Sequence, residues 1–481
     1  MGNVSFDSFK INSNILEAIE KLGFKNPSEV QEKVIPLILS GKDVIVKSET
    51  GSGKTASYGI PICQRVVIEE KSPQALVLTP TRELAIQVKE DIGSIGRFDK
   101  IRCEAIYGKQ PMSLQIRELK QRIHVIAGTP GRLQDHIDRG TIDLSKIKYL
   151  VIDEADKMFN MGFIDQVEGI LKKLPSNQIT ALFSATMDYE IETLTEKYMI
   201  KPVKVDISDE NLTVDKIDQH YYRASLNEKF SLLLNVLYSE NPDSMILFCN
   251  TKEAVDNLTS KLKDLGYPCR SIHGGMEQKD RISTMKDFKR GEFPILAATD
   301  VAARGIDIED ISHIINYDVP MEKESYVHRI GRTGRAGRGG TAISLVFPWE
   351  IKFLQQIEEY IGLKIEEKAA PDLEETEKGK TIFENKMKSK PKLKEDKSEN
   401  LNSEITKLYI NSGKKKKLRP GDIVGAITGI DGIEAENIGI IDILDYISYV
   451  EILNGKGELV LKELQHTPIK GKIVKVQRAK E

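Results

Sequence analysis

Two series of short apolar runs, separated by stretches with a helical pattern, do most to constrain the fold of this 481-residue chain. The runs expected to form the strands of one sheet lie at 43–46, 75–78, 124–127, 149–152 and 180–183. Those of a second sheet lie at 245–248, 295–298, 313–316 and 342–346. Strands that alternate with helices form parallel sheets with helices on both faces. The sequence therefore predicts two α/β domains in tandem, over 1–206 and 215–366, with a cleft between them.

The composition changes after residue 366. The segment 367–403 is first acidic and then rich in lysine, with few large apolar residues, so we expect a flexible charged linker. Strand patterns return at 408–411, 439–442, 449–452 and 472–476, with helices predicted at 420–426 and 457–464. The order strand–helix–strand–strand–helix–strand is shared by RNA-recognition modules (RRMs) and many other domains. A small α+β domain is therefore predicted over 404–481.

Charge and cysteine content exclude several classes of protein. The formal net charge is −3, so a surface that binds nucleic acid would have to be local. The four cysteines form no CxxC pair, which argues against a zinc site and against a disulfide framework. The N-terminus lacks the pattern of a signal peptide, and no apolar run approaches the roughly 18 residues of a membrane span. We therefore expect a soluble, cytoplasmic protein.

A glycine-rich loop follows the first apolar run and precedes a helical pattern. Its glycines allow backbone N–H groups to surround phosphates, and the helix adds its positive N-terminal end. Lys54 is expected to reach the β- and γ-phosphates, and the Thr55 hydroxyl to bind Mg²⁺. The predicted phosphate-binding residues are Ser48, Glu49, Thr50, Gly51, Ser52, Gly53, Lys54 and Thr55.

An acidic tetrapeptide, Asp153-Glu154-Ala155-Asp156, follows the apolar run at 149–152. A buried strand that ends in carboxylates presents them to a metal–nucleotide complex. Asp153 is expected to hold the metal, directly or through water, and Glu154 to orient and deprotonate the attacking water. Together with the glycine-rich loop, this motif predicts ATP and Mg²⁺ as cofactors.

The second α/β domain lacks a phosphate loop but carries arginines beside glycines, in His328-Arg329-Ile330-Gly331-Arg332-Thr333-Gly334-Arg335. Arginine stabilises charge on a transferring phosphoryl group because its planar, always charged fork is bidentate. If this segment faces the phosphate loop across the cleft, its arginines are expected to act as arginine fingers.

These residues, in this order, resemble the DEAD-box family of RNA-dependent ATPases over about residues 1–366. The resemblance implies two RecA-like domains and local strand separation driven by ATP. It implies that Gln31 contacts the adenine edge and that Phe24 stacks on the ring, with Phe6 packed behind it. It also implies that Asp307 meets the ribose and that Arg332 and Arg335 are the fingers.

The same resemblance assigns residues to RNA contact and to coupling between the ligands. The RNA-side residues are Thr81, Arg82, Thr129, Arg132, Gln278, Arg281, Thr299 and Arg304. The coupling residues are Ser184, Thr186 and His328. The segment Tyr107-Gly108-Lys109 stands where the family usually has two glycines, and the lysine could add a phosphate contact.

The C-terminal domain carries a cluster of positive charge that should favour nucleic-acid phosphates. The residues of this basic loop are Lys414, Lys415, Lys416, Lys417 and Arg419. Tyr409 stands where an RRM has its first stacking aromatic, but the second aromatic signature is absent, so loop or edge contacts are favoured over the sheet face.

The region from about 404 to 478 resembles the C-terminal domain of the DbpA/YxiN subgroup of the same family. That similarity implies binding of a hairpin in 23S ribosomal RNA and action on neighbouring helices in pre-50S particles. Nothing in the sequence suggests obligate assembly, so we expect a monomer. The alternatives are a general RNA chaperone helicase, an RNA clamp without ATP turnover, and a DNA translocase with the same core.

Overall fold

The computed structural model describes residues 4–48, 52–207, 217–300, 311–334, 339–391, 393 and 401–479. They fall into two compact units, one with the residues up to Asp206 and those from 396 onward, the other with the residues from 207 to 395. No helix in these ranges is long and apolar enough to span a membrane.

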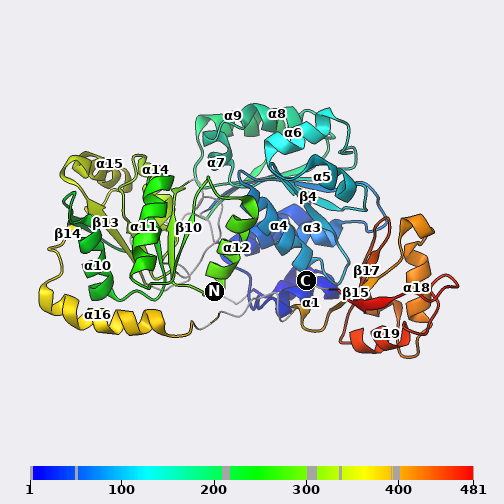
Figure 1. The fold of residues 1–481 in the computed structure, drawn as a ribbon. Coiled ribbons are helices and arrows are strands. Elements are labelled where there is room, and N and C mark those ends of the chain that lie inside the picture. Colours follow the sequence, from blue (N-terminus) through cyan, green and yellow to red (C-terminus); the bar gives the residue numbers. More distant parts are fainter. Residues whose placement is uncertain are drawn as a thin grey trace. The chain divides into compact units, whose positions relative to one another are not determined.

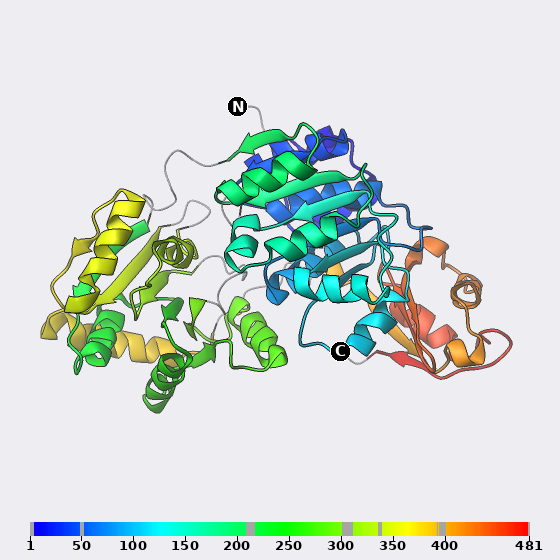
Figure 2. The ribbon, with the colours of Figure 1, turned by 90° about the horizontal axis from the view of Figure 1, so that it is seen from above.

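The first unit contains a seven-stranded sheet in the order β3-β4-β2-β5-β6-β1-β7, and every pair in it is parallel. Figure 1 shows α6, α8 and α9 on one face and α1, α3 and α4 on the other, and Figure 2 shows the same layers from above. The strands are β1 (Val44–Lys47), β2 (Ala75–Leu78), β3 (Cys103–Ile106), β4 (Val125–Gly128), β5 (Tyr149–Ile152), β6 (Ile179–Ser184) and β7 (Val203–Asp206). The helices are α1 (Ser13–Lys21), α2 (Glu29–Leu39), α3 (Lys54–Arg65), α4 (Arg82–Ile95), α5 (Met112–Leu119), α6 (Pro130–Asp138), α7 (Ala155–Asn160), α8 (Ile164–Leu171) and α9 (Tyr189–Tyr198).

The second unit contains another seven-stranded parallel sheet, in the order β10-β11-β9-β12-β13-β8-β14. Its strands are β8 (Ile217–Arg223), β9 (Met245–Phe248), β10 (Cys269–Ile272), β11 (Ile295–Ala298), β12 (His313–Asn316), β13 (Gly340–Val346) and β14 (Glu366–Glu367). Its helices include α10 (Lys229–Glu240), α11 (Lys252–Asp264), α12 (Gln278–Lys289), α14 (Lys323–Ile330), α15 (Ile351–Ile361) and α16 (Leu373–Lys388).

Two parallel sheets were predicted, and both are present. The sequence did not predict β3, β7, β8, β10 or β14. Of these, β7 reads Val-Lys-Val-Asp and β10 reads Cys-Arg-Ser-Ile, so neither offers the continuous apolar run of a fully buried strand. Such strands are stabilised by hydrogen bonds to a neighbour, which a local pattern does not reveal.

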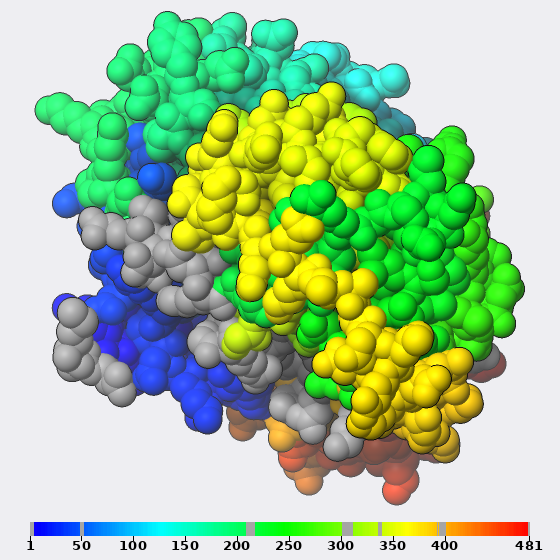
Figure 3. Space-filling model, turned by 90° about the vertical axis from the view of Figure 1, so that its left-hand side faces the viewer, coloured from blue at the N-terminus to red at the C-terminus, as the bar shows by residue number. Residues whose placement is uncertain are grey.

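Helix α16 overturns part of the expected linker. Residues 367–403 were predicted to contain no packed element, yet Phe383 of α16 is fully buried and Met387 nearly so. The Phe383 ring lies 5.3 Å from that of Tyr267 and 5.8 Å from that of Tyr238 on α10. Figures 1 and 3 show the yellow segment with α16 against the green elements of the second sheet. The composition is mostly polar because one narrow face of the helix supplies all of the burial.

The C-terminal domain is an antiparallel four-stranded sheet in the order β16-β17-β15-β18, with two helices. Its elements are β15 (Thr406–Ile410), α18 (Pro420–Thr428), β16 (Ile438–Ile443), β17 (Ser448–Ile452), α19 (Gly457–Glu463) and β18 (Val476–Arg478). The predicted order of elements is confirmed. The last strand was expected at 472–476 and instead occupies Val476–Arg478, because Lys472 closes a turn by pairing with Ile469.

Candidate functional site

The phosphate-binding loop between β1 and α3 is held by residues at the start of α2. Ser28 Oγ donates a hydrogen bond of 2.8 Å to the Ser52 carbonyl, and Gln31 Nε2 donates one of 3.2 Å to the Gly53 carbonyl. Gly53 has a φ of 91°, in the left-handed region, and a Cβ there would lie 2.5 Å from Gln31 Nε2. Glycine at this position is therefore favoured by the backbone conformation, and it leaves room for the side chain of Gln31.

Lys54 is the first residue of α3, so its charge adds to the positive end of that helix. Its side chain is 8% exposed, and its Nζ donates a hydrogen bond of 3.2 Å to the Ser48 carbonyl. Ser48 follows β1, and Thr55 is the second residue of α3. Glu49, Thr50 and Gly51 lie outside the described residues.

Gln31, assigned to adenine by resemblance, is held firmly against the loop. Its Oε1 accepts a hydrogen bond of 3.0 Å from the Ser28 N–H, in addition to the bond that its Nε2 donates. The ring of half-buried Phe24 lies 6.4 Å from that of Phe6, as expected for this pair. The contact of Gln31 and Phe24 with adenine itself stays a prediction.

Asp153 lies directly after β5 and is almost fully buried. Its Oδ2 accepts a hydrogen bond of 2.9 Å from the Tyr58 hydroxyl, and its Oδ1 has no hydrogen-bond partner among the described residues. Burial raises the pKa of Asp153 above its usual value, and the charge of Lys54 opposes this rise. A buried carboxylate oxygen without a partner suits a metal ion or a metal-bound water.

Tyr58 was not predicted as part of the site. It is fully buried in α3, and its ring packs 5.3 Å from that of Phe183. Burial and the nearby Asp153 raise its pKa well above the usual value, so it stays a hydrogen-bond donor at neutral pH. No short motif identifies Tyr58 in the sequence. The one available signal is its position one helical turn after Lys54, on the face of α3 that meets β5.

Glu154 has a φ of 54°, in the left-handed region that non-glycine residues rarely adopt. Its Oε1 accepts a hydrogen bond of 2.7 Å from Lys157 Nζ, and both side chains are largely buried. This backbone conformation turns the chain from β5 into α7 and sets the direction of the carboxylate. Lys157 was missed by the sequence analysis, although it stands three residues after Glu154 at the start of a helix.

Ser184 connects the phosphate-binding loop with the acidic motif. Its carbonyl accepts a hydrogen bond of 3.0 Å from the Ser48 N–H, and its Oγ accepts one of 3.3 Å from the Asp156 N–H. Thr186 Oγ1 donates a hydrogen bond of 3.1 Å to Asp188. Ser184 thus contacts the first motif through its main chain and the second through its side chain. This placement suits the coupling role predicted for Ser184.

The predicted RNA-side residues of the first unit stand at the carboxyl ends of β2 and β4. Thr81 caps α4 by accepting a hydrogen bond from the Leu84 N–H at 3.2 Å, and Arg82 opens that helix. Thr129 is the N-cap residue of α6, in which Arg132 lies, but its side chain makes no capping hydrogen bond. These positions share one edge of the sheet with Asp153, because all the strands are parallel.

Arg132 is oriented by groups that the sequence analysis did not identify. Its Nη1 donates hydrogen bonds of 2.8 Å to the Gln110 carbonyl and to Gln115 Oε1. Gln115 is fully buried and also donates to the Tyr107 carbonyl at 2.9 Å. Lys109, where the family usually has glycine, has a φ of 65°, a backbone conformation that glycine adopts without strain.

In the second unit, Arg329 is 1% exposed and makes several hydrogen bonds. It donates to both carboxylate oxygens of Asp300, at 2.6 and 2.7 Å, and to Asn250 Oδ1 at 2.9 Å. It also donates to Asn316 Oδ1 at 3.2 Å and to the Asp318 carbonyl at 2.6 Å. Its guanidinium therefore links the segments at the ends of β9, β11 and β12, which is a structural role.

The other predicted residues of this unit lie on three separate segments. Gln278 and Arg281 are on α12, Thr299 follows β11, and His328 is on α14. Arg332, in the turn after α14, is 4% exposed. Arg304, Asp307 and Arg335 lie outside the described residues.

The basic loop of the C-terminal domain has a defined conformation. The Lys414 and Lys415 N–H groups donate hydrogen bonds of 2.8 Å to the carbonyls of Leu444 and Asp445. A Cβ on Gly413 would clash with that same Leu444 carbonyl. Leu418 is buried beneath the loop, whereas all five basic side chains are exposed. The loop therefore presents its charges outward from a fixed backbone.

The face of the C-terminal sheet opposite its helices carries a tyrosine pair. Tyr409 and Tyr449 are cross-strand partners, with ring centroids 5.8 Å apart in an edge-to-face arrangement. Lys407 Nζ lies 5.3 Å from the centroid of the Tyr449 ring. Each ring thus packs against a neighbour. The preference for loop or edge contacts over this face stays a prediction.

The phosphate loop, the acidic motif and the two parallel sheets define an RNA-dependent ATPase and helicase, and the chain belongs to the DEAD-box family. Models of the DEAD/DEAH box helicase, the helicase conserved C-terminal domain and the DbpA RNA binding domain match residues 28–194, 228–337 and 407–478.

Similar proteins of known name extend this assignment. The chain is 56% identical over 98% of its length to the ATP-dependent RNA helicase DbpA of Bacillus subtilis (strain 168), 99% of which is covered. It is 45% identical over 78% of its length to the DEAD-box ATP-dependent RNA helicase CshA of Geobacillus kaustophilus, 80% of which is covered. S. cerevisiae Dbp5 bound to RNA and ADP BeF3 matches 80% of this chain and all of that one, with a TM-score of 0.70 and 33% identity.

Proposed function

We propose that the ATP site works as a metal-assisted phosphoryl-transfer centre. Lys54 and the N-terminus of α3 bind the phosphates, and Asp153, with Thr55, would hold Mg²⁺, which neutralises charge on the phosphate oxygens when bound. Glu154 takes a proton from the attacking water, and Arg332 and Arg335 stabilise the charge that develops on the γ-phosphoryl group. The buried Asp153 Oδ1 without a partner among the described residues supports this role.

RNA binding is coupled to ATP hydrolysis by closure of the two α/β domains around both ligands. The predicted RNA-side residues come from both α/β domains, and so do the predicted ATP contacts. Each ligand that contacts both domains favours a closed state, and a bent single strand is held where a regular duplex would not fit. Hydrolysis and phosphate release reopen the domains, so one ATP is used for a local separation of strands.

The substrate is a hairpin of 23S ribosomal RNA, bound by the C-terminal domain in the cytoplasm, and the helicase core acts on adjacent duplexes in pre-50S particles as a monomer. The observation that carries this proposal is the basic loop, whose fixed backbone presents five exposed positive charges. A fixed arrangement of charges suits a folded RNA better than it suits random single strands. The match to a DbpA RNA-binding domain over 407–478 supports it.

The test compares the stimulation of ATP hydrolysis by a 23S fragment with that by random RNA of equal length. We expect half-maximal stimulation at a concentration at least about tenfold lower for the 23S fragment, equivalent to about 1.4 kcal/mol of binding free energy. Replacing Lys414, Lys415, Lys416 and Lys417 by Ala should remove this preference and leave the maximal rate unchanged.

A matched variant removes the same charge elsewhere, by replacing the exposed Lys42, Lys172, Lys173 and Lys462 by Ala. It should keep the preference for the 23S fragment. Equal stimulation by the two RNAs in the unaltered protein would instead indicate a general RNA chaperone helicase.

A further inference from the structure

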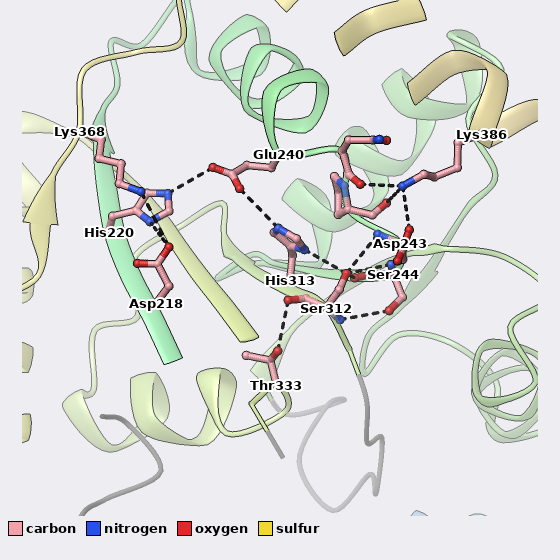
Figure 4. A network of polar contacts seen from close by, with 12 residues as sticks. Asp218, His220, Glu240, Asp243, Ser244, Ser312, His313, Thr333, Lys368 and Lys386 are labelled. Atoms are coloured by element: carbon pink, nitrogen blue, oxygen red, sulfur yellow. Dashed lines mark hydrogen bonds and ion pairs between the residues drawn. The ribbon is translucent and has the colours of Figure 1, made fainter. Parts of the chain in front are cut away.

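The turn that carries Arg332 is anchored on its C-terminal side by a buried threonine. Thr333 is fully buried, and its Oγ1 donates a hydrogen bond to the Ile311 carbonyl and lies 3.3 Å from the Ser312 carbonyl. Its own N–H donates a hydrogen bond of 3.0 Å to the Ile330 carbonyl at the end of α14. Figure 4 shows Thr333 reaching the segment before β12 from the turn after α14.

A glycine on the opposite side confines Thr333 further. A Cβ on Gly340, the first residue of β13, would clash with both Thr333 Oγ1 and the Gly334 N–H. Thr333 is thus held between the start of β13 and the segment that precedes β12, and its hydroxyl has little room to shift.

The carbonyl groups that accept from Thr333 belong to a segment that is itself fixed. Ser312 Oγ accepts hydrogen bonds from the Asp243 and Ser244 N–H groups, at 3.2 and 3.1 Å, and donates one of 2.6 Å to the Ser244 carbonyl. Lys386 of α16 binds this neighbouring turn, with its Nζ 2.8 Å from Asp243 Oδ1 and 2.7 Å from the Asn241 carbonyl. Figure 4 follows these contacts from Thr333 to Lys386.

The N-terminal side of the same turn is anchored by Arg329 and its contacts with Asp300, Asn250, Asn316 and Asp318. Only two residues separate Arg329 from Arg332, and Arg332 directly precedes Thr333. The backbone at Arg332 is therefore bounded by a charged anchor on one side and a hydroxyl anchor on the other.

We propose that Thr333 is a positioning residue for ATP hydrolysis: its hydroxyl fixes the backbone from which Arg332 reaches the transferring phosphoryl group. This inference rests on the finger role proposed above for Arg332. An arginine stabilises the transition state only when its fork meets the phosphoryl oxygens, and an error of about 1 Å in the placement of a catalytic group can cost about 10²-fold in rate. The effect of Thr333 is exerted through Arg332, so it should appear in the rate of the chemical step and not in the binding of ATP.

The experiment uses the full-length protein and compares Thr333→Ser with Thr333→Ala, which differ only in the hydroxyl. Thr333→Ala should lower the kcat of RNA-stimulated ATP hydrolysis by about 10- to 100-fold, with the KM for ATP within about 3-fold of the unaltered protein. Thr333→Ser should retain kcat within about 3-fold. If Thr333→Ala does not fold, as judged by its thermal transition, Thr333→Val takes its place because it keeps the volume of the side chain.

A second comparison separates positioning from a purely structural role. When Arg332 has been changed to Ala, adding Thr333→Ala should lower kcat by less than about 2-fold, because the group that it positions is gone. Thr259→Val, on α11, serves as the control for removing a buried threonine hydroxyl elsewhere in this unit and should leave kcat unchanged.

The outcomes distinguish the two proposals. If Arg332→Ala alone leaves kcat unchanged, the finger role of Arg332 is wrong. If Arg332→Ala lowers kcat while Thr333→Ala folds and keeps the normal kcat, or lowers it by the same factor in the Arg332→Ala background, the positioning role of Thr333 is wrong.

Discussion

Burial disfavours the charged form of Asp153. In the nucleotide-free protein this lowers the free energy of unfolding by an amount that depends on pH. Its pKa in the folded protein lies above the usual value of 3.8. Between those two values the folded state holds more protons than the unfolded state, so the free energy of unfolding falls as the pH rises through this range. The full cost is present only above the folded-state pKa.

Asp153→Asn should therefore unfold at a higher denaturant concentration than the unaltered protein at pH 7. It should also lose at least about 10²-fold in ATP hydrolysis because it loses the carboxylate proposed to bind Mg²⁺. The gain in stability should shrink as the pH is lowered through the folded-state pKa and vanish near pH 3.8. Urea unfolding of both proteins without nucleotide, at pH values from about 4 to 8, measures the difference in stability. A gain that does not vary with pH would contradict the assigned cause.

Glu154→Gln should lower the kcat of RNA-stimulated ATP hydrolysis by about 10²- to 10⁴-fold, because the amide cannot take a proton from water. ATP binding should change little, since Lys54 and the α3 N-terminus are untouched. Steady-state hydrolysis and nucleotide titration measure the two effects separately. Normal turnover in this variant would rule out Glu154 as the base.

The residues proposed to perform the chemistry could be picked out from the sequence, whereas those that support them could not. Lys54, Asp153 and Glu154 stand in short motifs whose residue types follow from phosphate and metal chemistry. Their supporting partners are separated from them along the chain. Tyr58, which contacts Asp153, lies 95 positions away, and Gln115, which contacts Arg132, lies 17 positions away. Such partners are set by how strands and helices pack, which a local pattern does not contain.

At the scale of elements, α16 shows the limit of composition as a guide. The segment is rich in charge, and its large apolar residues include Leu373 and Ile382, which are exposed, as well as the buried Phe383. A helix that completes an existing core needs only one or two deep side chains, because α10 and the sheet supply the rest. The low apolar content of the segment therefore predicts a linker.

Phe383→Ala should destabilise the second α/β unit by about 3–5 kcal/mol, because it removes a fully buried ring from between Tyr238 and Tyr267. Its neighbour provides the control: Ile382 is 57% exposed, and Ile382→Ala should change the stability by no more than about 0.5 kcal/mol. Urea unfolding of the full chain measures both. Equal effects of the two substitutions would show that α16 is not packed as described.

At the scale of the whole molecule, the division into two α/β units and a small C-terminal domain could be predicted, because hydrophobic periodicity and a change in composition extend over tens of residues. The choice of RNA could not be predicted from the same patterns. Contacts with phosphates carry no sequence information, and a cluster of lysines predicts affinity without specificity. The net charge of −3 also conceals the basic loop, which becomes apparent only when charge is considered locally.

The basic loop should dominate the salt dependence of RNA binding by the whole protein, although the net charge is negative. Each lysine that neutralises a phosphate releases counterions and makes the slope of log K against log salt steeper by about 0.7–0.9. Replacing Lys414, Lys415, Lys416 and Lys417 by Ala should therefore make that slope shallower by about 3–4 units. Binding of the 23S fragment between about 50 and 200 mM salt measures the slope. The variant with Lys42, Lys172, Lys173 and Lys462 replaced by Ala removes equal charge and should keep the original slope. If the two variants shift the slope equally, the overall charge of the protein, and not the fixed loop, governs its attraction to RNA.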